Sequence, residues 1–186
     1  MTTSDILAAY ARFERFEAVG STNDIVRAWL AEGTREVCVA VADEQNAGRG
    51  RNGRTWAAPK GAALLCSVGF RPAWLNAAQV WRLAAIVALA MADAAEDVAG
   101  LSEGTIRLKW PNDLVVVDGG PDALLIGDIS AADALQRRSA PLALRKLAGI
   151  LGETEGLGTA DPRMVVGIGI NAGWSAADFQ RNSGRR

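Results

Sequence analysis

Residues 45–56 read QNAGRGRNGRTW, and glycine and arginine alternate at the centre of this segment. Glycine lets the backbone turn and bring its N–H groups close to a ligand. Arginine adds a planar, permanent cation that pairs well with phosphate or carboxylate. The pattern is typical of a loop that wraps a small polyanion. A solvated loop or a flexible tail that touches nucleic acid has the same composition, so the flanking sequence has to decide between them.

Two short apolar runs flank this loop. Residues 37–42 (VCVAVA) precede it and residues 61–70 (GAALLCSVGF) follow it. Each run has the length and composition of a buried strand. Because a loop held between two buried strands is ordered, we predict an anion-binding site here and not a tail.

The composition excludes several functional classes. The chain has 186 residues and a formal net charge of -1. This composition does not predict the broad basic surface of a protein that binds nucleic acid or anionic membranes. Cys38 and Cys66 lie within the apolar runs, so we predict buried free thiols. The longest apolar run, residues 83–92, is too short to span a bilayer. These features predict a soluble, cytoplasmic protein of one domain.

The absence of histidine narrows the chemistry further. It removes the Ser-His-Asp and Cys-His nucleophile systems and the usual zinc sites. Catalysis would then rely on lysine, arginine, carboxylates, backbone N–H groups or a hard metal such as Mg²⁺. That set suits nucleotide chemistry, in which positioning and charge stabilisation supply most of the rate.

Hydrophobic periodicity predicts both helices and strands. Helices are expected over residues 5–13, from the cap-type residues at Ser21 to Gly33, and from Asn76 to Gly100. Short strands are expected at residues 106–110, 113–117, 146–152 and 164–170. Residues 118–145 have no regular pattern, and we predict an extended loop there.

Three further segments place polar groups among apolar residues: KWPND at 109–113, KLAGILGE at 146–153 and GIGIN at 167–171. Lys109 falls at a strand end, where a lysine is either solvated or directed at a ligand. Glycines inside a strand indicate either a bulge or the close approach of a ligand or another backbone.

Together with Ser21-Thr22-Asn23, these segments resemble the catalytic domain of biotin protein ligases. The matching motifs are STN at 21–23, GRGRxGRxW at 48–56, KWPND at 109–113, KxxGILxE at 146–153 and GIGIN at 167–171. Five motifs in the same order are far more specific than any one of them. The resemblance implies an α+β fold with a mixed, largely antiparallel sheet and helices packed on one face. That fold is shared by biotin and lipoate ligases and is related to class II aminoacyl-tRNA synthetases.

The resemblance implies a biotin–[acetyl-CoA-carboxylase] ligase that works in two steps. Biotin's carboxylate attacks the α-phosphate of ATP, giving biotinyl-5′-AMP and pyrophosphate. A lysine of a biotin carboxyl carrier domain then attacks this anhydride, and AMP leaves. The implied cofactors are ATP and Mg²⁺, with the metal bound mainly through ATP. The implied partners are biotin, ATP and the carrier domain, with no nucleic acid or membrane, and a homodimer is compatible with the reaction.

The resemblance also assigns site residues. The expected catalytic residues are Lys109, Arg51 and Arg49, with Lys109 bridging the biotin carboxylate and the α-phosphate. The expected biotin-binding residues are Ser21, Thr22, Asn23, Gln45, Gly48, Lys109 and Gly149. The expected ATP- or adenylate-binding residues are Arg49, Gly50, Arg51, Arg54, Trp56 and Asn171.

The domain expectation is a catalytic domain over residues 1–174, with a loop insertion at 118–145 and a disordered tail at 175–186. The family's N-terminal DNA-binding domain and small C-terminal β domain are expected to be absent. Three alternatives stay open from the sequence: a relative that binds biotin or its adenylate with little transfer, a lipoate-type ligase, and a nucleic-acid binder that uses the Gly/Arg loop.

Overall fold

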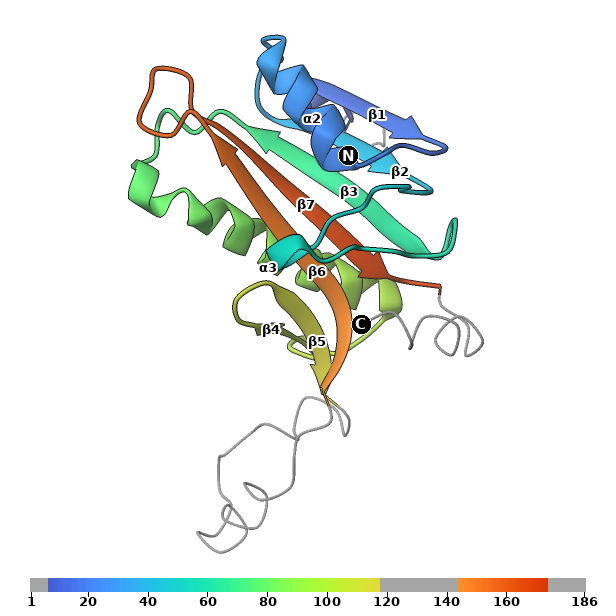
Figure 1. Cartoon of the computed structure of the whole chain (residues 1–186). Coiled ribbons are helices and arrows are strands. Elements are labelled where there is room, and N and C mark those ends of the chain that lie inside the picture. The colour runs from blue at the N-terminus through green and yellow to red at the C-terminus, as the bar shows by residue number, and fades with distance from the viewer. Residues whose placement is uncertain (1–6, 118–143, 174–186) are drawn as a thin grey trace, which may run out of the picture. The chain divides into compact units, whose positions relative to one another are not determined.

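The computed structural model describes residues 7–117 and 144–173 (Figure 1). The chain divides into two compact units. The first unit comprises Met1–Val87 and Ala148–Arg186, and the second comprises Ala88–Leu147. The predicted insertion at 118–145 and the predicted tail at 175–186 fall largely or wholly outside the described residues, so those two expectations stay predictions.

A β-sheet forms the centre of the first unit. Its strands lie in the order β1-β2-β3-β7-β6. Their bounds are Arg12–Phe16 for β1, Cys38–Ala42 for β2, Ala63–Phe70 for β3, Arg163–Asn171 for β7 and Leu144–Glu155 for β6, which begins in the second unit. Strands β1 and β2 are parallel, and the β2–β3, β3–β7 and β7–β6 pairs are antiparallel. The mixed, largely antiparallel sheet expected from the sequence is confirmed.

The helices of the first unit cover different faces of this sheet. Helix α2 (Thr22–Ala31) lies so close to β7 that a Cβ at Gly167 would overlap the Asn23 side chain. On the other face, a Cβ at Gly152 would lie 3.7 Å from Cβ of Ala84, at the start of α3 (Trp81–Ala99). Gly152 is paired with Val166, the immediate neighbour of Gly167, and successive strand residues point to opposite faces. The expectation that the helices pack on one face of the sheet is therefore corrected, since these two helices contact opposite faces.

The core beneath α2 explains why this helix forms. Its apolar face contributes Val26, Trp29 and Leu30, which pack against Cys38, Ala40 and Val165 of the sheet. Burying each large apolar side chain contributes roughly 1.5–3 kcal/mol, so packing and not propensity holds the helix. Cys38 and Cys66 are both buried and free, as predicted, and burial raises the pKa of the Cys66 thiol to about 12.

The second unit contains a β-hairpin next to the C-terminal part of α3 in the sequence. Strands β4 (Ile106–Lys109) and β5 (Asp113–Val117) pair antiparallel. The buried carboxylate of Glu96 accepts hydrogen bonds from the backbone N–H groups of Gly104 at 3.0 Å and Ile106 at 2.6 Å. This carboxylate ties the helix to the start of the hairpin.

The N-terminal helix prediction is wrong in its extent. Among the described residues of the helix expected at 5–13, residues 7 and 8 are helical, and β1 starts at Arg12. Its sequence, RFERF, does not alternate in polarity, because Glu14 and Arg15 are both charged, but the burial of its residues alternates one by one. That period of two is the signal of a half-buried strand. The predicted cap at Asn76 is confirmed, since its Oδ1 accepts a hydrogen bond from the N–H of Ala78 at 2.9 Å.

The helical segment from Ala77 to Ala99 is longer than the apolar run recognised in the sequence. Its 23 residues are long and apolar enough to cross a membrane by length and composition alone, although core helices of soluble proteins pass the same test. The statement that this region is too short to span a bilayer is therefore corrected. Its exposed large apolar side chains are Trp81, Ile86, Leu89 and Val98.

Candidate functional site: the Gly/Arg loop and its supports

The Gly/Arg loop, residues 48–56, doubles back on itself as a small hairpin. The N–H of Trp56 donates to the carbonyl of Gly48 at 2.9 Å, and the N–H of Gly50 donates to the carbonyl of Arg54 at 2.7 Å. The turn between them is a short 3₁₀ segment, Arg51–Gly53. We call residues 48, 49, 55 and 56 the loop base and residues 51–54 the loop tip. These hydrogen bonds give the loop the defined backbone expected of an ordered site. The tip residues are all exposed, so Arg51 and Arg54 face solvent.

The loop base rests directly on the sheet. The indole of Trp56 lies over Gly169 of β7, so closely that a Cβ at Gly169 would stand 2.6 Å from the indole nitrogen. Gly169 lies on the same face as Gly167 and therefore on the face that carries α2. Gly48 is buried against the backbone of Trp56. The glycine in the GIGIN motif thus provides the room in which the tryptophan of the GRGRxGRxW motif sits.

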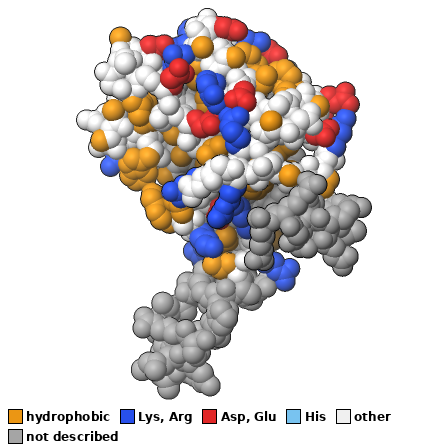
Figure 2. All heavy atoms as spheres, in the orientation of Figure 1, with side chains coloured by type: hydrophobic (Ala, Val, Ile, Leu, Met, Phe, Trp, Pro, Cys, Tyr) orange, Lys and Arg blue, Asp and Glu red, His pale blue; other side chains and the backbone are white. Residues whose placement is uncertain are grey.

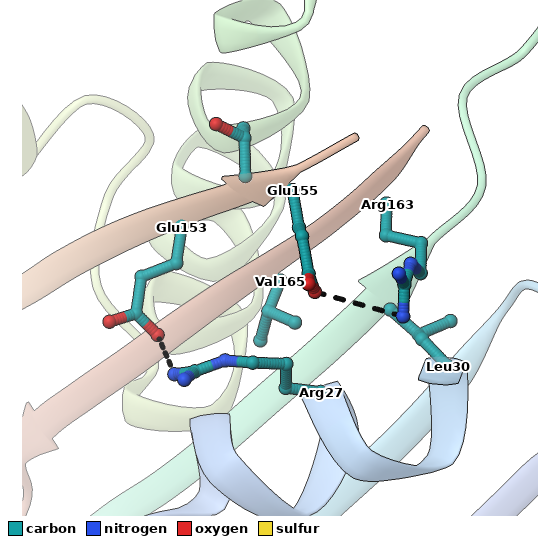
Figure 3. Close-up of a pocket in the computed structure, with 7 residues that line it drawn as sticks. Arg27, Leu30, Glu153, Glu155, Arg163 and Val165 are labelled. Atoms are coloured by element: carbon teal, nitrogen blue, oxygen red, sulfur yellow. Dashed lines mark hydrogen bonds and ion pairs between the residues drawn. The ribbon is translucent and has the colours of Figure 1, made fainter. Parts of the chain in front are cut away.

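Four charged side chains form a closed ring beside the loop base, which we call the charge ring: Asp24, Arg27, Arg49 and Glu153. Arg49 donates to both carboxylate oxygens of Asp24 at 2.8 and 2.9 Å and contacts Glu153 at 3.1 Å. Arg27 donates to Asp24 and to Glu153, each at 2.9 Å. Figure 3 shows Arg27 and Glu153 pointing at each other from α2 and β6. The ring therefore joins α2, the loop and β6.

The ring perturbs the acidity of its members. The hydrogen bond from Arg49 is the main cause that lowers the pKa of Asp24, and the charges of Arg49 and Arg27 add to it against the effect of burial. Burial on its own would raise the pKa of Glu153, but hydrogen bonds from Arg49 and Asn23 and the two arginine charges outweigh burial and lower that pKa. The hydrogen bond to Asp24 is the leading cause that raises the pKa of Arg49.

A chain of buried hydrogen bonds runs behind the ring. The Oε1 of Gln45 accepts from the Thr22 N–H at 2.7 Å and from the Thr22 hydroxyl at 3.0 Å. The Ser67 hydroxyl lies 2.7 Å from Thr22 Oγ1 and 2.6 Å from Asn23 Oδ1. Asn23 Nδ2 donates to Glu153 at 2.8 Å. The structure thus brings together three residues predicted to bind biotin, and it bonds them to one another and to the ring.

The remaining predicted residues of the first unit lie along the same sheet. Ser21 is buried at the N-terminal cap of α2. Gly149 of β6 is paired with Gly169. Asn171 ends β7 opposite Ala63, and its amide oxygen is buried with no hydrogen-bond partner among the residues that the structure describes. A buried amide oxygen of this kind suits a hydrogen-bond donor of a ligand or a metal ion.

Lys109 belongs to the second unit. It ends β4 opposite Asp113 of β5, and its side chain is exposed. Within the same unit, Lys146 Nζ lies 2.7 Å from Asp113 Oδ1. The KWPND and KxxGILxE motifs therefore meet through an ion pair, and Lys146, which received no role from the sequence, is part of this cluster.

A pocket of about 310 Å³ lies beside the charge ring on the first unit (Figure 3). It is lined by Arg27, Leu30, Glu153, Thr154, Glu155, Arg163 and Val165. Charged side chains of both signs are interleaved on this side of the molecule (Figure 2). None of the residues predicted to bind biotin or ATP lines this pocket, which is separate from the loop tip.

Sequence reasoning missed four residues of the arrangement: Asp24, Arg27, Ser67 and Glu153. Two had a usable signal. Ser67 is the single hydroxyl in the apolar run 61–70, and Glu153 closes the KxxGILxE motif. A polar group inside a buried strand is expected to have a partner, and that expectation points to Ser67 without naming the partner.

We expect Asp24→Asn to lower the free energy of unfolding by about 1 kcal/mol at pH 7, the scale of exposed ion pairs, because the side chain is 47% exposed. The folded-state pKa of Asp24 is depressed, so this contribution is fully present above the ordinary aspartate pKa, about 3.9, and is lost as pH falls below that value through the lower folded-state pKa. Urea unfolding at pH 7 and at about pH 2.5, well below the ordinary aspartate pKa, measures it, with exposed Asp93→Asn as the control. A difference between Asp24→Asn and wild type that grows at the lower pH would contradict this reading.

The fold and the five motifs place the chain in one family. A sequence model of the biotin/lipoate A/B protein ligase family matches residues 16–171. The match covers most of the chain and every motif that builds the loop, its supports and the hairpin of the second unit. The chain therefore belongs to this family.

Comparison with individual relatives gives a more specific result than the family model does. The biotin--[acetyl-CoA-carboxylase] ligase of Mycobacterium tuberculosis is 34% identical over 154 residues, which cover 82% of this chain and 46% of that protein. The bifunctional ligase/repressor BirA of Salmonella typhimurium is 33% identical over 153 residues, covering 82% of this chain and 38% of that protein. The chain thus spans less than half the length of these curated relatives.

Solved structures agree on the fold. The biotin protein ligase of Leishmania major in complex with biotinyl-5-AMP has a TM-score of 0.60 and 27% identity, covering 86% of this chain and 56% of that one. The Aquifex aeolicus biotin protein ligase in complex with biotin and ATP has a TM-score of 0.58 and 24% identity, covering 88% and 53%. The fold type expected from the resemblance is confirmed.

Proposed function

We propose that this chain is the catalytic part of an ATP-dependent biotin protein ligase, which forms biotinyl-5′-AMP and passes biotin to a lysine of a biotin carboxyl carrier domain. One observation carries the proposal. The Gly/Arg loop has its base fixed on the sheet and its arginine-bearing tip exposed. The similar Leishmania major protein is one that holds biotinyl-5-AMP, the anionic product such a tip suits.

The first chemical step fits the residues available. Biotin's carboxylate is already an anion, so attack on the α-phosphate needs no histidine base. The charge that develops on the phosphoryl group is met by the guanidinium groups of Arg51 and Arg54, which donate hydrogen bonds in a fixed geometry. Lys109 is the proposed contact to the biotin carboxylate and the α-phosphate.

The loop's second task is to protect the adenylate. A mixed anhydride hydrolyses in water, so the site has to exclude solvent until the carrier lysine arrives. The tip is exposed and joined to a fixed base, an arrangement that lets it close over a bound ligand. In the second step the carrier amine attacks the biotinyl carbonyl, the carbonyl–phosphate bond breaks, and AMP leaves with the electron pair.

Magnesium is proposed to enter with ATP and to neutralise charge on its phosphates. Residues 7–117 and 144–173 contain no group of three His, Cys, Asp or Glu side chains that could hold an ion. The partnerless amide oxygen of Asn171 is our candidate for a contact to the metal that the triphosphate carries, and the N–H₂ group of the same side chain is the candidate donor to the triphosphate. We also propose a cytoplasmic location, where biotin, ATP and carboxylases are available.

The test is pyrophosphate release. With biotin and ATP we expect a burst of about one pyrophosphate per chain, because the adenylate stays bound, followed by turnover when a carrier domain is added. Lipoate with ATP is the matched control, since the family also includes lipoate ligases. A burst with lipoate and none with biotin would replace the proposal by a lipoate ligase. Biotin binding without any release would leave only a binding protein.

A further inference from the structure

We propose that the charge ring is a positioning device. In this proposal, Asp24 and Glu153 hold Arg49 and with it the loop base, so that only the tip, residues 51–54, moves onto the ligand. The inference rests on the proposed function for what the tip binds. It assigns the two arginines at positions 49 and 51 different tasks, although they stand side by side in one motif.

The hydrogen bonds of Arg49 support the division. Its Nη1 and Nη2 both donate to Asp24, and its Nε and Nη2 both donate to Glu153. A guanidinium has five N–H groups in a rigid fork, and four of them are engaged in this arrangement. The fork that a phosphate would require is already occupied by two carboxylates.

The balance of charge supports it as well. The ring contains two arginines and two carboxylates, and each arginine contacts both carboxylates. Such a set carries no net charge, so it adds little to the attraction of a polyanion. The loop's net positive charge therefore lies at its tip, on Arg51 and Arg54.

Glu153 is itself held from behind. It lies in β6 opposite Val165 of β7, and it accepts a hydrogen bond from Asn23, which is only 4% exposed. Asn23 is in turn close to the buried Ser67 hydroxyl. Because its own strand, the paired strand β7 and Asn23 of α2 all fix its position, Glu153 can orient Arg49.

The contrary reading is that Arg49 leaves the ring and contacts phosphate directly. The two readings differ in how mutations combine. If Arg49 acts through the ring, its removal should cost little once its two carboxylate partners are gone. If Arg49 touches the ligand, its removal should cost the same in either background.

The first measurement needs no ligand. Trypsin cleaves after arginine, and Arg51 and Arg54 are exposed tip residues. We expect Glu153→Gln to speed cleavage after these two residues at least fivefold, because the base is released. Glu155→Gln is the matched control on the same strand. Its carboxylate contacts Arg163 at 3.7 Å and not the ring. Equal cleavage rates in the two variants would overturn the proposal.

The second measurement is a double-mutant cycle on biotinyl-5′-AMP synthesis. We expect Arg49→Ala to reduce kcat/KM for ATP about tenfold in the wild-type chain and less than twofold in the Asp24→Asn/Glu153→Gln background. A tenfold loss in both backgrounds would overturn the proposal and make Arg49 a ligand contact. If Glu153→Gln does not fold, Asp24→Asn serves alone, since its side chain is partly exposed. If no pyrophosphate is released from biotin and ATP, the proposed ligase function is rejected. The trypsin measurement still tests whether the charge ring holds the loop base.

Discussion

Replacing Arg51 with alanine is expected to lower the rate of biotinyl-5′-AMP formation at least 100-fold and to leave thermal unfolding unchanged. Arg51 lies at the exposed loop tip and forms no ion pair with any residue in 7–117 or 144–173. Removing its side chain therefore breaks no ion pair that stabilises the folded state. A preorganised donor aimed at developing charge contributes roughly 3 kcal/mol to the transition state, which is a factor of more than 100 in rate.

The measurement is adenylate formation from ATP labelled in the α-phosphate, with biotin saturating. Arg35→Ala is the matched control, because Arg35 is an exposed arginine outside the loop. Arg51→Lys should fall between wild type and alanine, since lysine keeps the charge but loses the bidentate fork. Lys109→Ala is expected to match Arg51→Ala. Undiminished synthesis in both alanine variants would refute the assignment of the site.

Local sequence signals were sufficient for most of the secondary structure. The two apolar runs around the Gly/Arg loop became β2 and β3 because each is short, apolar and bounded by turn residues. The helix beginning after Ser21 was recognisable because its apolar residues repeat at helical spacing up to Gly33. Strand β1 was missed because RFERF has no strict alternation of apolar and polar residues, Glu14 and Arg15 both being charged, so the sequence lacks the usual signal of a half-buried strand.

The charge ring could not be read from the sequence. Asp24 and Arg27 are neighbours on a helix, but Glu153 reaches them through the pairing of β6 with β7, and Arg49 reaches them through the loop base, which rests on β7. A shift of one residue in that register would turn Glu153 to the opposite face. The motifs identified which segments matter, whereas the partners within them depend on long-range registers.

The placement of the two helices on opposite faces of the sheet also depends on strand register, so it could not be predicted from the sequence. Gly152 and Gly167 each make room for a neighbour, and nothing in their sequence context says on which face. The strand pairing decides it, because Gly152 is opposite Val166 and not opposite Gly167. The family resemblance supplied a fold type, and the residue contacts supplied the arrangement.

A single methyl group at position 169 is expected to disable the loop. In Gly169→Ala the new Cβ would stand within 2.6 Å of the Trp56 indole nitrogen, a contact that real Cβ atoms do not make. The indole has to move, because the other partner is the backbone of a central strand flanked by β3 and β6. We expect a loss of about 1–3 kcal/mol in the free energy of unfolding, typical of an overpacked site, and a fall in adenylate synthesis of more than 50-fold.

Two comparisons make this expectation specific to the loop. Gly20→Ala adds the same methyl group where no atom lies within 4 Å, so its stability and activity should match wild type. Gly169→Ala/Trp56→Ala removes the indole that the methyl group displaces, and it should recover most of the stability but not the activity. Stability and activity should respond differently because the double variant removes the steric clash, whereas the loop base still lacks the indole that rests on the sheet. If Gly169→Ala folds and forms adenylate like Gly20→Ala, Trp56 does not anchor the loop, and the fixed base would then depend on the charge ring alone.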